Sequence, residues 1–544
     1  GADTMHIGPS ATAFYRSRSW APAWTSDGKM KDEGKALLAQ LSRTGDDGLS
    51  PERYHYSMAQ RLVSALGSGD DKARAQAASN LDIALSEGFA RYADDLAGGT
   101  LDPKQAGLEF HLAKERAPKV QALQLIASGT RADSVVTTLR PHTVVYTRMM
   151  QALARYRAIA ARGGWPMVGA GATGATGATS PDSSRGTGAA TSSDSTTSHG
   201  RHARHSAASS GSVAQVRARL MAGEDSVEAG LAASGRAAPA TLDANLRQAI
   251  THFQQRMGLQ ANGRIGPATV KALNVPVQVR MEALAVNMDR WRWLPRDLGS
   301  LYVMVNLPAF KVDVMQGDSA VMEQKVVVGK PGWNTPVFAD RMVQLIVNPY
   351  WNVPKSIVAE ELGPEMAKDP NYLAEHHFQP TSDGGYRQMP GPKNSLGLFK
   401  FQLTNDEDIY LHDTPAKDLF GKPDRDLSHG CIRLQDARAM AYFVGQREGI
   451  SQEAIDRAQA SGDNHVFDLK NPIPVYIMYF TAAVQPDGSI AFYPDVYDFD
   501  AHMAALFPKL QGQPVDSDTV ARDSAAVADS LKQVKASHVG KSTA

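Results

Sequence analysis

Apolar residues recur at helical spacing through the first ~165 residues. One stripe follows the capping candidates Asp70 and Asp71 and consists of Leu81, Leu85, Phe89, Tyr92 and Leu96. A second stripe follows Pro141 and consists of Tyr146, Met149, Met150, Leu153 and Tyr156. It ends at the Gly-Gly-Trp-Pro run of residues 163–166, a strong helix stop. The pattern therefore predicts a helical domain over residues 1–167.

The composition then changes twice before residue 300. Residues 168–212 are almost entirely Gly, Ala, Ser and Thr, too few apolar side chains to offset the entropy of ordering, so we predict a disordered low-complexity linker. Residues 213–275 return to helical spacing and should form a small three-helix module. Its stripe is Leu242, Leu246, Ile250 and Phe253, and Pro267 stands at the first turn of a further helix.

From about residue 300 the apolar period becomes two, which indicates strands. Leu301, Val303, Val305 and Leu307 alternate with polar or less apolar positions, and Val343, Leu345 and Val347 continue the pattern. Near the end, the Pro-Asp-Gly of residues 486–488 predicts a hairpin turn. We predict a mostly antiparallel β domain over residues 299–512, followed by a flexible tail over residues 513–544.

A long insertion interrupts this β domain at about residues 350–395. Residues 358–372 are predicted to be helical, because Leu362, Met366 and Tyr372 are spaced among acidic and basic residues. Connections this long are usually functional or disordered. A helical insertion could fold over a cleft and exclude water, with Trp351 either packing against a substrate or serving the core.

Charge and hydropathy exclude some classes of protein. Lys+Arg and Asp+Glu both number 57, and a net charge of zero argues against nucleic-acid binding, which needs a basic footprint. No apolar run approaches the roughly 18 residues that span a membrane. The chain begins Gly1-Ala2-Asp3, and we expect that a signal peptide has been removed.

The chain has one cysteine, Cys431, which excludes a disulfide framework. A lone cysteine is either a small buried apolar residue or a reactive thiol, and its neighbours must decide. Gly430 precedes it, and glycine permits positive φ and close backbone approach. The N–H groups of Gly430 and Cys431 can then point at one spot beside the sulfur, as an acyl-transfer oxyanion requires.

A histidine that could activate this thiol stands upstream. On a strand, Tyr410 and His412 share one face, and Pro415 ends the strand soon after. Other interpretations stay open from the residues alone. His429 is as consistent with a structural histidine, and Arg433 with an ordinary ion pair. A zinc site of His412, His429 and Cys431 is disfavoured because the usual pair spacing is absent.

The block from His412 to Ser428-His429-Gly430-Cys431-Ile432-Arg433 resembles the signature of the YkuD-type L,D-transpeptidases. That signature is a His, roughly fifteen residues, then Ser/Thr-His-Gly-Cys and a hydrophobic residue. The resemblance implies that Cys431 is the nucleophile and His412 the base, oriented through the main chain of Asp413, and that His429 and Gly430 belong to the catalytic motif. It suggests as substrate contacts Tyr410, Arg433, Trp351, Ser428 and Asp413.

The resemblance extends along the chain. Leu242–Asn274 is similar to peptidoglycan-binding modules of the Phe-Gln…Gly-Leu type, and segments near Trp20–Trp24 and residues 48–54 resemble the scaffold domain of the large YcbB-like subgroup. Residues 348–354 and 390–397 match the ends of that subgroup's lid. The implied fold is multidomain α+β, with a helical scaffold, a small peptidoglycan-binding domain, a connecting helix over residues 276–298 that packs with the scaffold, and a mostly β catalytic domain.

By this resemblance the protein cross-links peptidoglycan stem peptides in the periplasm through a Cys431 thioester, forming 3–3 links, without metal or cofactor. Its expected partners are peptidoglycan and other wall-synthesis proteins, with no nucleic acid, and carbapenems should acylate Cys431. The alternative enzyme activity is L,D-carboxypeptidase, in which water takes the thioester. The alternative from another class is a non-catalytic wall-binding protein.

Overall fold

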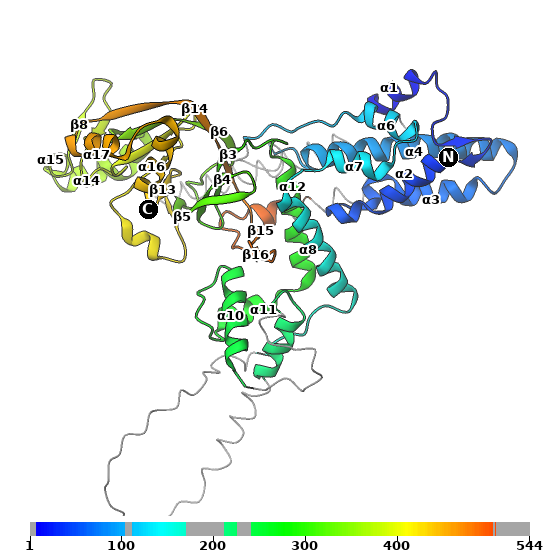
Figure 1. Ribbon diagram of the computed structural model, residues 1–544, viewed down its shortest axis with the longest axis horizontal. Coiled ribbons are helices and arrows are strands. Elements are labelled where there is room, and N and C mark those ends of the chain that lie inside the picture. The colour runs from blue at the N-terminus through cyan, green and yellow to red at the C-terminus, as the bar shows by residue number, and fades with distance from the viewer. Residues whose placement is uncertain (1–6, 104–110, 170–211, 226–240, 504–505, 507–544) are drawn as a thin grey trace, which may run out of the picture.

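The computed structural model describes residues 7–103, 111–169, 212–225, 241–503 and 506. A helical part lies at one end of the molecule, a β-rich part at the other, and a small helical module hangs below their junction (Figure 1). The predicted multidomain α+β class is confirmed. The predicted tail over residues 513–544 and most of the predicted linker over residues 168–212 lie outside the described residues.

The helical part is built on the two predicted apolar stripes. Its elements are α1 (Pro9–Ser17), β1 (Thr25–Ser26), β2 (Lys29–Met30), α2 (Asp32–Ser42), the 3₁₀ turns Thr44–Asp47 and Pro51–Tyr54, α3 (Tyr56–Ala65), α4 (Asp71–Gly98), α6 (Lys119–Ala127), α7 (Ala132–Leu139) and α8 (Val144–Ala161). The Asp70 carboxylate caps α4 by accepting from the Ala73 N–H at 2.8 Å, as its position predicted. Every residue of the α4 stripe is buried.

Helix α12 (Val277–Arg292) joins the helical part to the β domain and packs against α8 and α4. Asp289 on α12 is fully buried, and its carboxylate accepts from the backbone N–H of Thr100 at 2.8 Å and from the Thr100 hydroxyl at 2.9 Å. A buried carboxylate needs such donors to offset the loss of water. These bonds fix the end of α4 against α12.

The small module contains a helix over residues 212–221, α10 (Ala244–Arg256) and α11 (Pro267–Leu273). Asp243 caps α10, and Pro267 occupies the first turn of α11 as predicted. The module packs on the hairpin of β15 (Ala482–Val484) and β16 (Ile490–Phe492), which turns at the predicted residues 486–488. Module and β domain share one apolar core.

The β domain is a nine-stranded mixed sheet in the order β12-β5-β13-β11-β10-β6-β14-β3-β4. Because β4 also pairs with β5, the sheet closes on itself as a barrel. The strands are β3 (Leu301–Asn306), β4 (Lys311–Gln316), β5 (Ser319–Gly329), β6 (Phe338–Val347), β10 (Phe399–Leu403), β11 (Leu411–His412), β12 (Asp426–Ser428), β13 (Ile432–Leu434) and β14 (His465–Met478). A 3₁₀ turn Lys417–Gly421 and helices α16 (Ala437–Glu448) and α17 (Gln452–Ser461) complete the domain.

The insertion forms a separate lobe, here called the lid. It contains β7 (Trp351–Asn352), α13 (Lys355–Ile357), a π-helical turn η4 (Val358–Leu362), α14 (Gly363–Lys368), α15 (Tyr372–Glu375), β8 (Phe378–Pro380) and β9 (Tyr386–Gln388), with strand order β7-β9-β8. The single helix expected over residues 358–372 is wrong in detail. Pro364 offers no N–H to the preceding turn, which widens to the π form, and the helix ends at Lys368.

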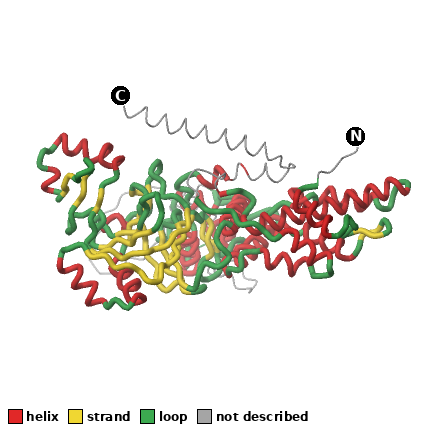
Figure 2. Tube along the Cα trace, turned by 90° about the horizontal axis from the view of Figure 1, so that it is seen from above, coloured by secondary structure: helices red, strands yellow, loops and turns green. Residues whose placement is uncertain are grey.

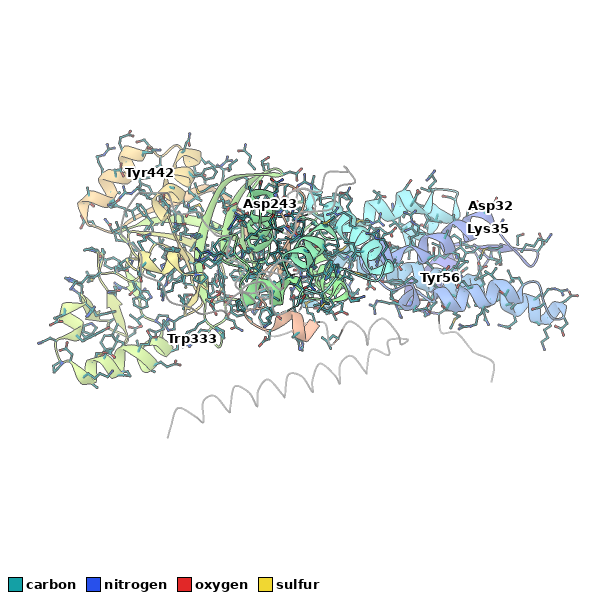
Figure 3. The ribbon with its side chains drawn as sticks, turned by 90° about the horizontal axis from the view of Figure 1, so that it is seen from below. Asp32, Lys35, Tyr56, Asp243, Trp333 and Tyr442 are labelled. Atoms are coloured by element: carbon teal, nitrogen blue, oxygen red, sulfur yellow. The ribbon has the colours of Figure 1, made fainter. Side chains whose placement is uncertain are left out.

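The lid and the pair α16–α17 lie on opposite sides of the barrel (Figures 2 and 3). Tyr442 on α16 and Trp333, beside the lid, mark these two sides in Figure 3. The barrel face on the Trp333 side is therefore the one that the lid covers.

Candidate active site

Three neighbouring strands of the barrel bring the predicted residues together. Lys400 on β10 pairs in register with His412 on β11, and His412 pairs with Arg433 on β13. Side chains in register point to the same face of a sheet. The row therefore reads Lys400, His412, Arg433 across the three strands.

The next row holds Tyr410 and Cys431. The Ile432 N–H donates to the Tyr410 carbonyl at 3.1 Å, which places Cys431 beside Tyr410 in this parallel pair. The rings of Tyr410 and His412 are 5.7 Å apart between centroids, so the predicted common face of these two residues is observed.

A braced turn presents the thiol between β12 and β13. Gly430 has φ of +114°, which L side chains rarely adopt. Its N–H donates to Ser428 Oγ at 3.2 Å, while Ser428 Oγ donates to the Cys431 carbonyl at 2.7 Å. Thr335 Oγ1 donates to the Gly430 carbonyl at 2.7 Å. Ser428, predicted as a substrate contact, is buried within these bonds and braces the turn.

The surroundings of the sulfur work in opposite directions on its ionisation. Cys431 is half-buried, and its Sγ lies 3.4 Å from the Asp408 carbonyl. Burial raises the pKa of the thiol, whereas hydrogen bonds from Tyr410 and the charges of Lys400 and Arg433 lower it. Burial is the largest of these effects, so the pKa of the thiol stays above its ordinary value, and the two cations and the tyrosine offset only part of the rise.

His412 is held as a neutral imidazole. It is 3% exposed, and burial followed by the charge of Arg433 lowers its pKa to about 3. Its Nδ1 lies 2.5 Å from the Asp413 carbonyl, and because a carbonyl only accepts, Nδ1 carries the hydrogen. Nε2 is then the unprotonated nitrogen and can act as a base.

The Asp413 carboxylate is bonded to neighbouring groups of the β domain. It accepts from the Leu398 N–H at 2.9 Å and pairs with Lys417 Nζ at 2.6 Å. A Cβ on Gly397 would come within 2.4 Å of this carboxylate, so the contact requires glycine there. Asp413, predicted as a substrate contact, is therefore engaged with the protein, and its main chain meets His412.

His429 faces the lid. Its Nε2 lies 2.7 Å from Glu361 Oε1 on η4 and 3.4 Å from Lys330 Nζ, and its ring meets the Trp333 ring edge-on at 4.9 Å. Burial lowers the pKa of His429, which Glu361 opposes. Sequence reasoning missed Glu361, Lys330 and Trp333, because no local pattern links residues so far apart.

Trp351 and Arg433 complete the site. Trp351 lies close enough to the Tyr410 hydroxyl to lower its pKa, against the rise that burial causes, and it lines a cavity of about 140 Å³ inside the lid together with Glu361 and Tyr372. Arg433 Nε is buried and has no hydrogen-bond partner among the described residues. Burial lowers the pKa of Arg433, while Cys431 and Glu361 oppose this shift.

Lys400 is a further residue that the sequence did not indicate. Its Nζ lies 3.8 Å from the centroid of the Tyr410 ring, a cation–π distance. Burial lowers the pKa of Lys400, while the charges of Cys431 and Asp408 raise it. A lysine between Phe399 and Phe401 signals only a strand with one polar face, and the register to His412 was not readable.

Within the described ranges, no three His, Cys, Asp or Glu side chains are grouped so as to hold a metal ion. His412, His429 and Cys431 thus do not converge as zinc ligands there. No helix in the described part of the chain is long and apolar enough to cross a membrane.

Comparison with known families agrees with this geometry. Residues 300–473 match the family model "L,D-transpeptidase catalytic domain" (YkuD). Residues 9–153 match "Scaffold domain", and residues 227–273 match "Putative peptidoglycan binding domain". The three matches follow one another along the chain in the order scaffold, peptidoglycan-binding and L,D-transpeptidase catalytic domain, and the predicted resemblance is confirmed.

A curated relative is the "Putative L,D-transpeptidase" of Haemophilus influenzae, 30% identical over 239 residues that cover 40% of this chain and 48% of that protein. The chain thus spans about half the length of this relative. Among solved structures, an L,D-transpeptidase from Mycobacterium smegmatis is 15% identical over 33% of this chain and 58% of its own, with a TM-score of 0.20. An L,D-transpeptidase from Stackebrandtia nassauensis is 14% identical, over 48% of this chain and 90% of its own, with a TM-score of 0.21.

Proposed function

We propose that this protein is a cysteine-dependent L,D-transpeptidase that cross-links peptidoglycan stem peptides, forming 3–3 links. One observation carries the proposal. The only thiol of the chain shares a sheet face with a neutral buried histidine and two cations, inside the domain that matches the L,D-transpeptidase catalytic model.

The first half-reaction forms a thioester. His412 Nε2 takes the proton of the Cys431 thiol, and Lys400 and Arg433 stabilise the thiolate as it forms. The sulfur attacks the carbonyl carbon of the diamino acid in a tetrapeptide stem. The C–N bond then breaks, and terminal D-Ala leaves as an amine with the proton from His412.

The second half-reaction resolves the thioester. A side-chain amine of a neighbouring stem attacks the same carbonyl carbon and gives a proton to His412. The C–S bond breaks, the new amide forms the cross-link, and the thiol is restored by the His412 proton. Atoms and charges balance without a metal or an organic cofactor.

The Cys431 N–H is the main candidate to hold the oxyanion. The Gly430 N–H is directed at Ser428 Oγ, so it can join only if that 3.2 Å bond opens. A substrate carbonyl placed at the sulfur would therefore meet the Cys431 amide first.

The substrate places this activity at the cell wall, which supports the periplasm as its location. The peptidoglycan-binding match supports retention on wall polymer by the small module. Carbapenems, which present a strained acyl carbonyl, should acylate Cys431.

Muropeptide analysis tests the proposal. The full chain is incubated with disaccharide-tetrapeptide stems, and the products are separated and weighed by mass spectrometry. A 3–3 dimer that is absent with Cys431→Ala supports transpeptidation. A trimmed tripeptide alone would assign L,D-carboxypeptidase activity, and no product at all would leave a wall-binding protein.

A further inference from the structure

The lid touches the catalytic motif through a carboxylate. Glu361 sits on the π turn η4, and its Oε1 lies 2.7 Å from His429 Nε2, two residues before Cys431. A π turn inside a helix is rare and often marks a functional position. The lid thus carries an acidic group to the edge of the thiol site.

Glu361 faces a recess of cationic and basic groups. Lys330 Nζ is 3.4 Å from the same His429 nitrogen, and the charges of Glu361 and Cys431 both act on Arg433. Arg433 Nε is buried and lacks a hydrogen-bond partner among the described residues, although Glu361 stands nearby. A buried guanidinium with an unused N–H donor is suited to bind a carboxylate that enters the recess further than Glu361 does.

The donor stem brings such a carboxylate. In the proposed reaction the bond that breaks links the diamino acid to the terminal residue, whose free carboxylate is only two bonds beyond the amide nitrogen. It must therefore lie within about 4–5 Å of the carbon that Cys431 attacks. Arg433 is two residues from Cys431 on the same sheet face, about 6–7 Å along the strand, which fits this reach.

We propose that Glu361 is an internal competitor of the substrate: with the lid closed, its carboxylate guards the recess of His429, Lys330 and Arg433, and the donor's terminal carboxylate displaces it. This proposal rests on the proposed function for the identity of the ligand. The Glu361 side chain is 51% exposed, so its contact with His429 is open to solvent and can be exchanged.

Alkylation of the single cysteine tests the competition without any turnover. Iodoacetate and iodoacetamide react alike, since the thiolate sulfur displaces iodide, but only iodoacetate carries a carboxylate next to the reacting carbon. The rate constant of iodoacetate at Cys431 divided by that of iodoacetamide therefore measures how readily the recess accepts a carboxylate. Mass spectrometry of the full chain reports each rate unambiguously, because there is one Cys.

Glu361→Gln should raise this ratio about fivefold, the effect of removing one nearby like charge at intermediate screening. Glu360→Gln is the matched control, since this exposed neighbour on the same turn loses the same charge. It should leave the ratio unchanged. Equal rises in both variants, or no rise with Glu361→Gln, would overturn the proposal.

A second measurement identifies the ligand. A tetrapeptide stem with a free terminal carboxylate should protect Cys431 from iodoacetamide at about fivefold lower concentration in Glu361→Gln than in the unchanged chain. The same stem with a terminal carboxamide should show no such difference. An equal gain for both stems would mean that Glu361 only fastens the lid, which overturns the competition. Failure of every stem to protect, with the iodoacetate ratio still raised, would instead count against the proposed function.

Discussion

The ammonium group of Lys400 lies 3.8 Å from the centroid of the Tyr410 ring, and Tyr410 lies beside Cys431 on the neighbouring strand, where it lowers the pKa of the thiol. Lys400 is also the register partner of His412. One lysine thus adjoins both members of the proposed catalytic pair. Because resting His412 is neutral, the positive charges that lower the pKa of Cys431 before the proton moves are those of Lys400 and Arg433.

Lys400→Met should therefore raise the pKa of Cys431, because the charge of Lys400 lowers it. We expect iodoacetamide to alkylate Cys431 about fivefold more slowly at pH 7, with the midpoint of the rate-against-pH curve moved upward. Lys400→Arg keeps the charge and should restore most of the rate. If the curve of Lys400→Met is unchanged, Lys400 does not act on the pKa of Cys431, and Arg433 is the cation that lowers it.

His412 should make the protein sensitive to acid. Its pKa of about 3 lies below the ordinary 6.5, so the unfolded chain binds one more proton between these values. Stability is therefore lost as pH falls below 6.5, by about 2.5 kcal/mol between pH 7 and pH 4.5. His412→Gln removes this titration and should show a smaller loss in urea unfolding over that range. An equal loss in both proteins would contradict the buried neutral imidazole.

Cys431→Ala should abolish thioester formation and cross-linking while leaving the fold intact, because the half-buried thiol contributes little to the core. We expect the melting temperature to change by no more than a few degrees. Intact mass after carbapenem treatment checks the chemistry, and a thermal scan checks the fold. A variant that melts far below the unchanged chain would favour a structural role for Cys431.

Much of the architecture could be predicted from local pattern. The α4 and α8 stripes, the cap at Asp70 and the common face of Tyr410 and His412 follow from periods of 3.6 and 2 and from capping chemistry. These features depend on residues close together in the sequence.

The rest depends on contacts between distant segments. The Lys400–His412 register and the Glu361–His429 contact join residues from different strands or from lid and barrel. Ser428 shows a subtler limit: its place in the motif suggested substrate, yet its hydroxyl braces the turn. Sequence pattern gives the face of a strand but not which neighbour satisfies a polar group.

The lid should decide which acceptor resolves the thioester. Trp351 lies close enough to Tyr410 to act on its pKa, and Glu361 contacts His429, so the lid meets the site at two points. Replacing residues 355–385 by a tight turn should slow cross-linking and raise the share of hydrolysed product, because water gains access. Cys431 should still be acylated by a carbapenem. An unchanged ratio of dimer to trimmed product would leave the lid as scaffolding.

The small module is joined to the barrel more closely than a modular sequence suggests. Arg256 on α10 donates to the Ile490 carbonyl of β16 and forms ion pairs with Glu224 and Asp225, and all three charged side chains are buried. Deleting residues 213–275 would expose this surface, so a point change is the better test of docking.

Arg256→Met should loosen the module, because it removes the buried cation that two buried carboxylates share and leaves Glu224 only Arg155 and Asp225 only His252. The cost should fall at the lower end of about 3–5 kcal/mol. Arg247→Met, on the same helix and only half-buried, is the matched control. We expect faster proteolysis between the module and the barrel and weaker retention on insoluble wall for Arg256→Met alone. Carbapenem acylation of Cys431 should persist, because the module supplies no residue to the site. Loss of acylation together with docking would show instead that the module holds the catalytic barrel in its active form.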